Sequence, residues 1–259
     1  MTGPDPRERF GPRAQAYARA RPGYPDEIAR EVARRLELAP GATVIDLGAG
    51  TGLSARPFVA LGFRVIAVEP NAAMREASPL RDAPGLAWVP GSAEATGLAP
   101  ACADLVIAAQ AFHWFDPARA RAEALRVLRP PARAALFWND RREEGSAFAR
   151  GYEALLRRHS REYLELRERH ASSERLRAFF GAPWMEFTLA HADRLDRSRL
   201  HDRTESASYL PAPGMPGHGA LIAELDALFD ATQDGGSVTM EYETRVLLGP
   251  IAPGTGLRE

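Results

Sequence analysis

The stretch that decides the fold reads Thr43-Val44-Ile45-Asp46-Leu47-Gly48-Ala49-Gly50-Thr51-Gly52. Its first half is apolar and rich in β-branched residues, which predicts a short buried strand. Its second half holds three glycines, which let the chain turn tightly and let a ligand approach the backbone. A helical pattern follows at residues 53–61, so the free N–H groups of a helix N-terminus would face that ligand. The segment therefore predicts a strand, a glycine-rich loop and a helix that together bind a nucleotide-like group.

A second apolar strand is expected at residues 64–68, and it is followed by Glu69 and Pro70. An acid in this place, about twenty residues after the first glycine, can accept hydrogen bonds from both hydroxyls of a ribose. Glu69 on its own could equally be a surface carboxylate, but the glycine loop favours it as the ribose ligand. Asn71 has the side chain needed to cap a helix at residues 72–77.

Strand-like and helical segments continue to alternate on both sides of this unit. Further strands are expected at residues 86–89, 103–109, 132–138, 187–195 and 238–248, and helices at residues 25–38, 116–128, 197–209 and 219–232. Strands that alternate with helices predict a parallel sheet covered on both faces. We therefore predict an α/β fold with a doubly wound, mostly parallel, seven-stranded sheet.

The pattern divides the chain into three regions. Residues 1–40 are expected to form an N-terminal helical lid and a first helix, and residues 41–140 the cofactor-binding α/β core. Residues 141–259 are expected to form a charged helical insertion that shapes the substrate pocket, followed by the strands that complete the sheet.

Composition limits the partners. The 259 residues carry a formal net charge of −1, and a protein that binds nucleic acid usually has a basic excess, so no nucleic-acid partner is expected.

Cys102 is the single cysteine, which excludes a cysteine-rich metal site and indicates a reducing compartment, the cytoplasm. No signal-peptide core and no apolar run of ~18 residues is present, so we expect no membrane partner. No metal is expected, and the oligomeric state stays open.

The glycine loop differs from two other nucleotide-binding loops, the dinucleotide-binding loop and the Walker loop. The glycines stand at positions 48, 50 and 52, so the third is one residue earlier than in the dinucleotide pattern G-x-G-x-x-G. A Walker loop is excluded because its Gly-Lys-Ser/Thr ending is absent. An NAD(P)-dependent oxidoreductase and a non-catalytic cofactor-binding protein remain as alternatives, because a fold alone does not decide a function.

The ordered set of motifs resembles class I S-adenosylmethionine-dependent methyltransferases. Residues 46–52 and 65–70 resemble the first two motifs of that family. Residues 91–94 resemble the segment that borders the adenine, residues 104–115 the fourth-strand motif, and residues 126–130 the stretch before the fifth strand. The sequence of residues 110–115, together with that of residues 17–25 upstream, is similar to sequences of a small-molecule branch of the family. This branch includes type 11 and trans-aconitate methyltransferase-like proteins. One departure is Pro131-Ala132, where the family usually has two glycines. The resemblance covers residues 8–140.

This resemblance implies a Rossmann-like fold with S-adenosyl-L-methionine as cofactor. It implies that the glycine loop and Gln110 lie near the methionine part, that Glu69 binds the ribose, and that Ala93 and Glu94 flank the adenine. The cofactor-binding residues it implies are Asp46, Gly48, Ala49, Gly50, Gly52, Glu69, Pro70, Asn71, Ser92, Ala93, Glu94 and Gln110.

Two residues after the fourth strand are candidates for the reacting centre. His113 is either a general base for a hydroxyl acceptor or a packed histidine, because a carboxylate acceptor needs no base. Trp114 either faces the sulfonium through a cation–π contact or is a core aromatic.

The remaining candidates for binding the methyl acceptor are residues of the N-terminal segment and of the fifth strand. Tyr17, Arg21 and Tyr24 are expected in an N-terminal lid, and Asn139 ends the fifth strand. Arg21 and Arg203 suit a carboxylate, because a guanidinium can bind it through two parallel hydrogen bonds. We therefore expect a small-molecule methyl acceptor, methylated on the oxygen of a carboxylate or a hydroxyl.

Overall fold

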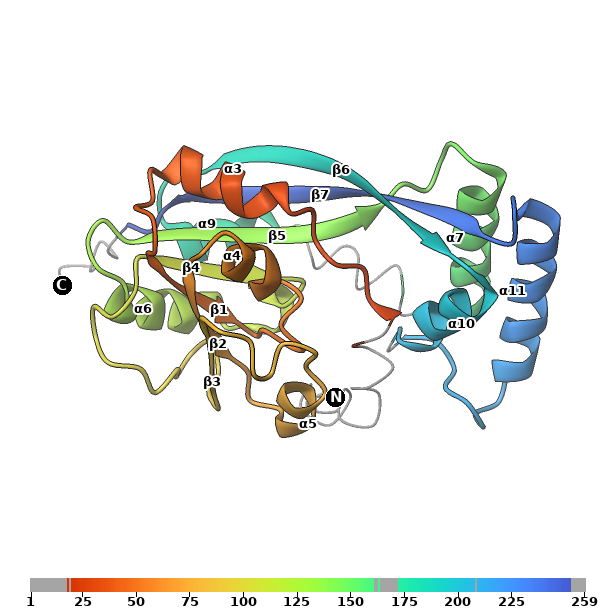
Figure 1. Ribbon diagram of the computed structural model, residues 1–259, viewed down its shortest axis with the longest axis horizontal. Coiled ribbons are helices and arrows are strands. Elements are labelled where there is room, and N and C mark those ends of the chain that lie inside the picture. The colour runs from red at the N-terminus through yellow and green to blue at the C-terminus, as the bar shows by residue number, and fades with distance from the viewer. Residues whose placement is uncertain (1–17, 19, 161–162, 164–171, 208, 253–259) are drawn as a thin grey trace.

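The computed structural model describes residues 18, 20–160, 163, 172–207 and 209–252. Seven strands form one sheet in the order β3-β2-β1-β4-β5-β7-β6 (Figure 1). Five of them are parallel: β1 (Thr43–Leu47), β2 (Arg64–Val68), β3 (Leu86–Val89), β4 (Leu105–Ala109) and β5 (Arg133–Arg141). β7 (Val238–Pro250) pairs antiparallel with both β5 and β6 (Met185–Leu195). The predicted seven-stranded, mostly parallel α/β sheet is confirmed.

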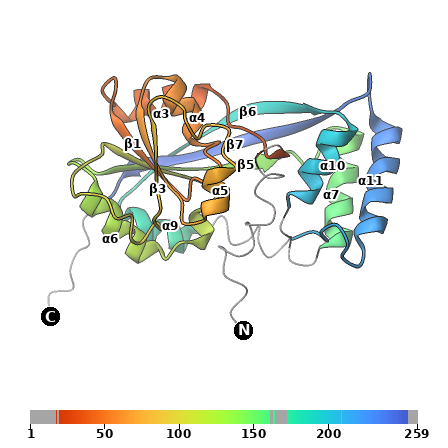
Figure 2. The ribbon, with the colours of Figure 1, turned by 60° about the horizontal axis from the view of Figure 1, so that its bottom comes forward.

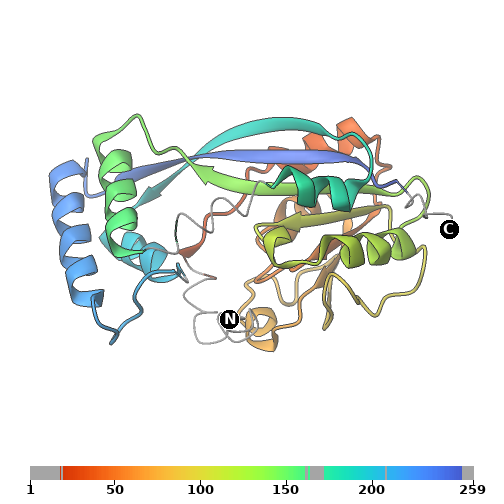
Figure 3. The same cartoon turned by 180° about the vertical axis from the view of Figure 1, so that it is seen from behind.

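Helices cover both faces of the parallel part of the sheet (Figure 2). On one face α3 (Glu27–Leu36) and α4 (Ala55–Ala60) pack with Val44 and Ile107. On the other face, α6 (Pro117–Val127) and α9 (Ser173–Phe180) pack with Ile45 and Val106 (Figure 3). Neighbouring strand residues thus enter opposite cores, because successive side chains of a strand point to opposite faces. This double cover explains why these strands are apolar throughout.

Two short segments confirm the expected helix starts. The side chain of Asn71 accepts hydrogen bonds from the N–H groups of Ala73 and Met74 at the start of α5 (Ala72–Glu76). Asp116 does the same for α6, and Pro117 occupies its first turn. Both caps use donors that would otherwise lack a partner inside the helix.

A second group of helices lies away from the parallel strands, at the far ends of β5, β6 and β7 (Figure 1). It consists of α7 (Ala147–His159), α10 (Arg197–Glu205) and α11 (His218–Thr232). Its apolar core includes Tyr152, Leu156 and Leu225 with Met240 of β7. We refer to α7, α10 and α11 as the helical unit. The fifth strand is longer than predicted, because its polar end, through Arg141, continues to pair with β7.

No helix among the described residues is long and apolar enough to cross a membrane.

Candidate functional site: a cavity at the carboxyl ends of the strands

A cavity of about 430 Å³, which includes space open to solvent, lies at the carboxyl ends of β1, β4 and β5. The strand order reverses between β1 and β4, and ligands of open α/β sheets bind at such a point. The cavity is lined by Arg21, Pro22, Tyr24, Gly48, Ala49, Gly50, Thr51, Leu53, Ser54, Ala109, Gln110 and Asn139.

The glycine loop forms one wall, and its shape depends on glycine. Gly48 and Gly50 have φ angles of 66° and 58°, in the left-handed region that side chains disfavour. A Cβ on Gly48 would lie 2.8 Å from the Cβ of Ala111, so the loop also touches the segment after β4. The N–H groups of Gly48 and Ala49 both donate to the carbonyl of Val68, which ties the loop to the end of β2.

Glu69 lies beneath this loop with 8% of its surface exposed. Its carboxylate accepts hydrogen bonds from the N–H of Gly50 at 2.9 Å and from the N–H of Asn71 at 2.8 Å. Burial raises the pKa of Glu69, and the two backbone donors partly offset the rise. Each carboxylate oxygen has a second lone pair, so two hydroxyl donors of a ribose can still be accepted. The ribose role expected of Glu69 stays a prediction.

Asp46 is fully buried at the end of β1. Its Oδ2 accepts a hydrogen bond of 2.5 Å from the hydroxyl of Ser54, which lines the cavity. Its Oδ1 has no hydrogen-bond partner among the described residues. Burial raises the pKa of Asp46 to about 7, and the charge of Glu69 adds to the rise. A buried oxygen of this kind usually has a partner, so it is consistent with a polar ligand or a water beside the loop.

Gln110 enters the cavity at the end of β4 with an unusual backbone. Its φ angle is 55°, and a non-glycine residue in this region is uncommon. Its N–H donates to the carbonyl of Phe137, and its side-chain amide donates to the carbonyl of Asn139 at 3.2 Å. Strain held by specific contacts often marks a functional position. The role of Gln110 near the cofactor stays a prediction.

The predicted cofactor residues divide into two groups. Gly48, Ala49, Gly50 and Gln110 line the cavity. The others lie outside that lining: Asp46, Gly52, Glu69, Pro70, Asn71, Ser92, Ala93 and Glu94. Glu94, expected beside the adenine, accepts a hydrogen bond from the N–H of Asp116 at 2.9 Å. Ala93 is buried in the core beneath α6. The adenine end therefore stays a prediction.

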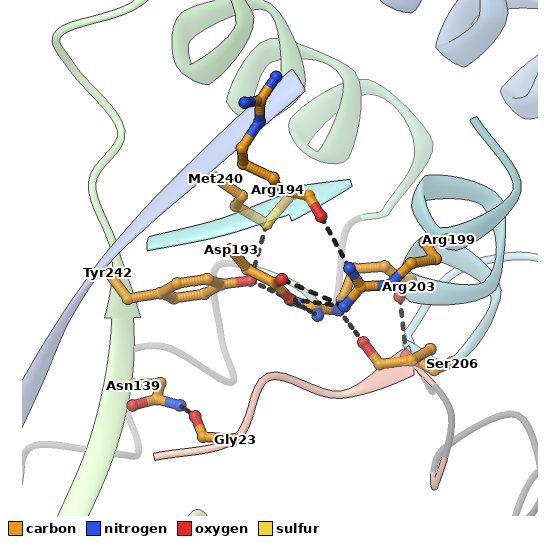
Figure 4. A network of polar contacts seen from close by, with 10 residues as sticks. Gly23, Asn139, Asp193, Arg194, Arg199, Arg203, Ser206, Met240 and Tyr242 are labelled. Atoms are coloured by element: carbon orange, nitrogen blue, oxygen red, sulfur yellow. Dashed lines mark hydrogen bonds and ion pairs between the residues drawn. The ribbon is translucent and has the colours of Figure 1, made fainter. Parts of the chain in front are cut away.

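Residues 20–24, which we call the strap, form another part of the cavity wall. Arg21, Pro22 and Tyr24 line it. Tyr24 is buried, with its ring edge-on to Phe137 at 4.9 Å. Asn139 lines the cavity too, and its side-chain amide donates to the carbonyl of Gly23 at 3.0 Å (Figure 4). Tyr17 lies outside the described residues.

His113 and Trp114 lie on the short helix η2 (Phe112–Trp114), with their rings 4.6 Å apart. Neither residue lines the cavity. Arg175 of α9 donates to the carbonyl of Phe115 at 2.5 Å, which fixes the end of this helix. The role of His113 as a base therefore stays a prediction.

Arg203 does not line the cavity, contrary to the hypothesis that it faces an acceptor carboxylate. It is buried and forms an ion pair of 2.7 Å with Asp193. The sequence carries no local signal for this pairing, because the two residues stand on β6 and α10. Among the described residues, no group of three or more His, Cys, Asp or Glu side chains could hold a metal ion.

Sequence reasoning missed several cavity residues. Thr51 lies within the glycine loop and Leu53 and Ser54 follow it directly, and this position is the signal that could have identified them. Pro22 and Ala109 carry no such signal, because an apolar side chain looks the same in a core and in a cavity wall.

Residues 45–136 match a family described as a methyltransferase domain. The chain is 43% identical over 139 residues to an uncharacterized methyltransferase of Mycobacterium tuberculosis. The aligned region covers 52% of this chain and 53% of that protein. It is 35% identical over 126 residues to an uncharacterized methyltransferase of Schizosaccharomyces pombe, covering 48% and 50%. The matched region thus spans about half the length of these relatives.

Solved structures resemble nearly the whole chain. A candidate type II methyltransferase from Anaeromyxobacter dehalogenans is 26% identical with a TM-score of 0.60, over 90% of this chain and 99% of that one. A candidate methyltransferase from an antibiotic biosynthesis pathway of Anabaena variabilis is 19% identical with a TM-score of 0.57, over 88% and 98%, and it supports the fold alone. S-adenosylmethionine is the cofactor of this domain, as the resemblance of the motifs implied.

Proposed function

We propose that this chain is an S-adenosylmethionine-dependent methyltransferase that methylates a small organic molecule on oxygen. The observation that carries the proposal is the hydrogen bond between the N–H of Gly50 and the carboxylate of Glu69. It brings the predicted methionine-binding loop and the predicted ribose ligand together beside one cavity, at the point where the strand order reverses.

The residues of the chain would act mainly by holding two reactants in line. S-adenosylmethionine, when bound, supplies a methyl group on a sulfonium, which is a good leaving group. Glu69 would accept the ribose hydroxyls, and the backbone of Gly48 and Gly50 would lie against the methionine part. The strap, which also lines the cavity, would cover the bound ligand and exclude water. Orientation of this kind can contribute ~7–11 kcal/mol of the barrier.

Polar side chains in the lining support a small polar acceptor. Arg21, Gln110 and Asn139 lie together in the lining, on the strap and at the ends of β4 and β5. A carboxylate acceptor needs no base, whereas a hydroxyl acceptor does. Because His113 lies outside the lining, we favour a carboxylate acceptor. This acceptor chemistry agrees with the proposed small-molecule branch, and the single cysteine supports a cytoplasmic location.

The strand order favours this proposal over a nicotinamide-dependent oxidoreductase. The dinucleotide-binding order is 3-2-1-4-5-6. Here β7 is inserted antiparallel between β5 and β6. A methyltransferase would bind S-adenosylmethionine at the glycine loop, whereas an oxidoreductase would bind NAD(P) there.

Titration calorimetry with S-adenosylmethionine, S-adenosylhomocysteine and NAD tests the cofactor. We expect heat of binding for the first two only, and preferential binding of NAD would overturn the proposal. A screen of small carboxylic acids and phenols with isotope-labelled cofactor tests the acceptor. Methyl transfer found only on RNA, DNA or a protein would refute the small-molecule part and leave the cofactor part intact.

A further inference from the structure

The strap is attached to the helical unit as well as to the sheet. The guanidinium of Arg203 on α10 donates from Nε to the carbonyl of Ala20. Three residues further along the chain, at the C-cap of α10, the carbonyl of Ser206 accepts a hydrogen bond from Nη2 of Arg21 at 3.4 Å. One wall of the cavity therefore depends on a helix that is not itself part of the lining.

Each nitrogen of the Arg203 guanidinium donates a hydrogen bond, and two of these contacts are to Asp193 and Tyr242 (Figure 4). Arg203 is 6% exposed. Its Nη2 donates to Oδ2 of Asp193 on β6 at 2.7 Å, and its Nη1 donates to the hydroxyl of Tyr242 on β7. Each of its three nitrogens thus has a different acceptor. The planar guanidinium cannot turn away from Ala20 without losing the other two contacts.

Asp193 has a second arginine partner that serves as a comparison. Nη2 of Arg199 lies 3.1 Å from Oδ1 of Asp193, and its Nη1 donates to the carbonyl of Arg194. Half of the Arg199 side chain is exposed. Among the described residues, none of its hydrogen bonds reaches the strap. The two arginines therefore share one carboxylate and one helix and differ in their contact with Ala20.

We propose that Arg203, oriented by Asp193, is a positioning residue for the cofactor site. Arg203 does not line the cavity, but its hydrogen bond to Ala20 holds the strap in place as part of the cavity wall. The position of the helical unit is thereby coupled to cofactor binding. The inference rests on the proposed function, because it takes S-adenosylmethionine as the ligand. Since binding couplings are reciprocal, cofactor bound against the strap must in turn stabilise the contact between the strap and α10.

The test compares Arg203→Met with Arg199→Met by calorimetry with S-adenosylhomocysteine. A tenfold change in a dissociation constant corresponds to ~1.4 kcal/mol, roughly the contribution of one hydrogen bond to a charged group. We expect a dissociation constant about tenfold higher for Arg203→Met. For Arg199→Met we expect less than about a twofold change, because exposed ion pairs contribute little. Equal affinities of a folded Arg203→Met variant and the wild type would overturn the proposal.

Hydrogen exchange of the strap gives a readout that a general loss of stability does not imitate. The amides of Ala20, Arg21, Gly23 and Tyr24 should exchange faster in Arg203→Met than in Arg199→Met, under conditions where both variants are folded by circular dichroism. Bound S-adenosylhomocysteine should slow their exchange in the wild type. Unchanged exchange of the strap in Arg203→Met refutes the anchor, whatever the cofactor proves to be.

Arg203→Lys covers the case in which the methionine variant does not fold. A lysine keeps the charge beside Asp193 but cannot donate to three divergent acceptors at once, so its strap exchange should lie between the wild type and the methionine variant. Wild-type exchange and affinity in Arg203→Lys would contradict the proposal. If the wild type does not bind S-adenosylhomocysteine, the proposed function fails, and the exchange comparison still decides the anchor.

Discussion

The N–H of Gly50 lies 2.9 Å from Oε2 of Glu69, so the turn of the glycine loop and the acid at the end of β2 form one hydrogen-bonded unit. The contact joins residues nineteen positions apart. Parallel pairing of β1 with β2 brings Leu47 beside Val68, and thereby brings the loop to the acid. The cofactor site is therefore prepared by the sheet before any ligand arrives.

Glu69→Ala should weaken cofactor binding without unfolding the protein. The variant loses the charged acceptor of two ribose hydroxyls, and each such hydrogen bond is worth roughly 1.5–3 kcal/mol. Calorimetry with S-adenosylhomocysteine measures the change, and circular dichroism checks the fold. Glu76→Ala is the matched control, because Glu76 is an exposed glutamate on α5 close by in the chain. Equal affinity of the two variants would show that Glu69 has no part in binding.

Gly50→Val should abolish cofactor binding. The φ of 58° strains any side chain there, and the valine would also project where the ligand meets the backbone. Gly62→Val is the control, because Gly62 has a φ of 88° with open space around its Cβ position and lies away from the cavity lining. Both variants should lose stability in urea denaturation. Only Gly50→Val should lose binding, and normal binding by a folded Gly50→Val would contradict the loop assignment.

Asp46→Asn should change how stability depends on pH. The folded pKa of Asp46 is raised to about 7 from 3.8, so the folded state holds a proton that the unfolded state releases at lower pH. The wild type therefore loses stability as the pH rises from about 4 to about 7, at up to ~1.4 kcal/mol per pH unit from this group. The asparagine keeps an acceptor for Ser54 and has no proton to lose.

Urea denaturation at pH 5 and pH 8 measures this difference. The variant should gain stability relative to the wild type at the higher pH. A stability difference that is the same at both pH values would mean that Asp46 is ionised throughout.

The core of the fold was predictable because its signals are local. The β-branched run of residues 43–47 formed the expected buried strand, and Asn71 and Asp116 capped the expected helices. The left-handed backbone of Gln110 had no such signal, because it depends on contacts with Phe137 and Asn139 on another strand.

The long-range polar contacts were not predictable for the same reason. Arg203 reaches Ala20 across 183 positions, and a pattern along the chain cannot show which of many arginines meets which carbonyl. The polar end of β5 also looks like a loop in sequence, and only its pairing with β7 keeps it extended.

The chemistry of the acceptor is decided by comparing Arg21→Ala with His113→Asn. Arg21 lines the cavity and can bind a carboxylate, whereas His113 lies on η2 outside the lining. For a carboxylate acceptor, Arg21→Ala should raise the Michaelis constant for the acceptor, and His113→Asn should leave the pH dependence of turnover unchanged. For a hydroxyl acceptor, His113→Asn should lose ~10²–10⁴-fold in rate, the loss expected when a general base is removed. Cofactor affinity, measured in parallel, separates damage to the acceptor site from damage to the strap. A large rate loss in His113→Asn with an intact cofactor site would overturn our preference for a carboxylate.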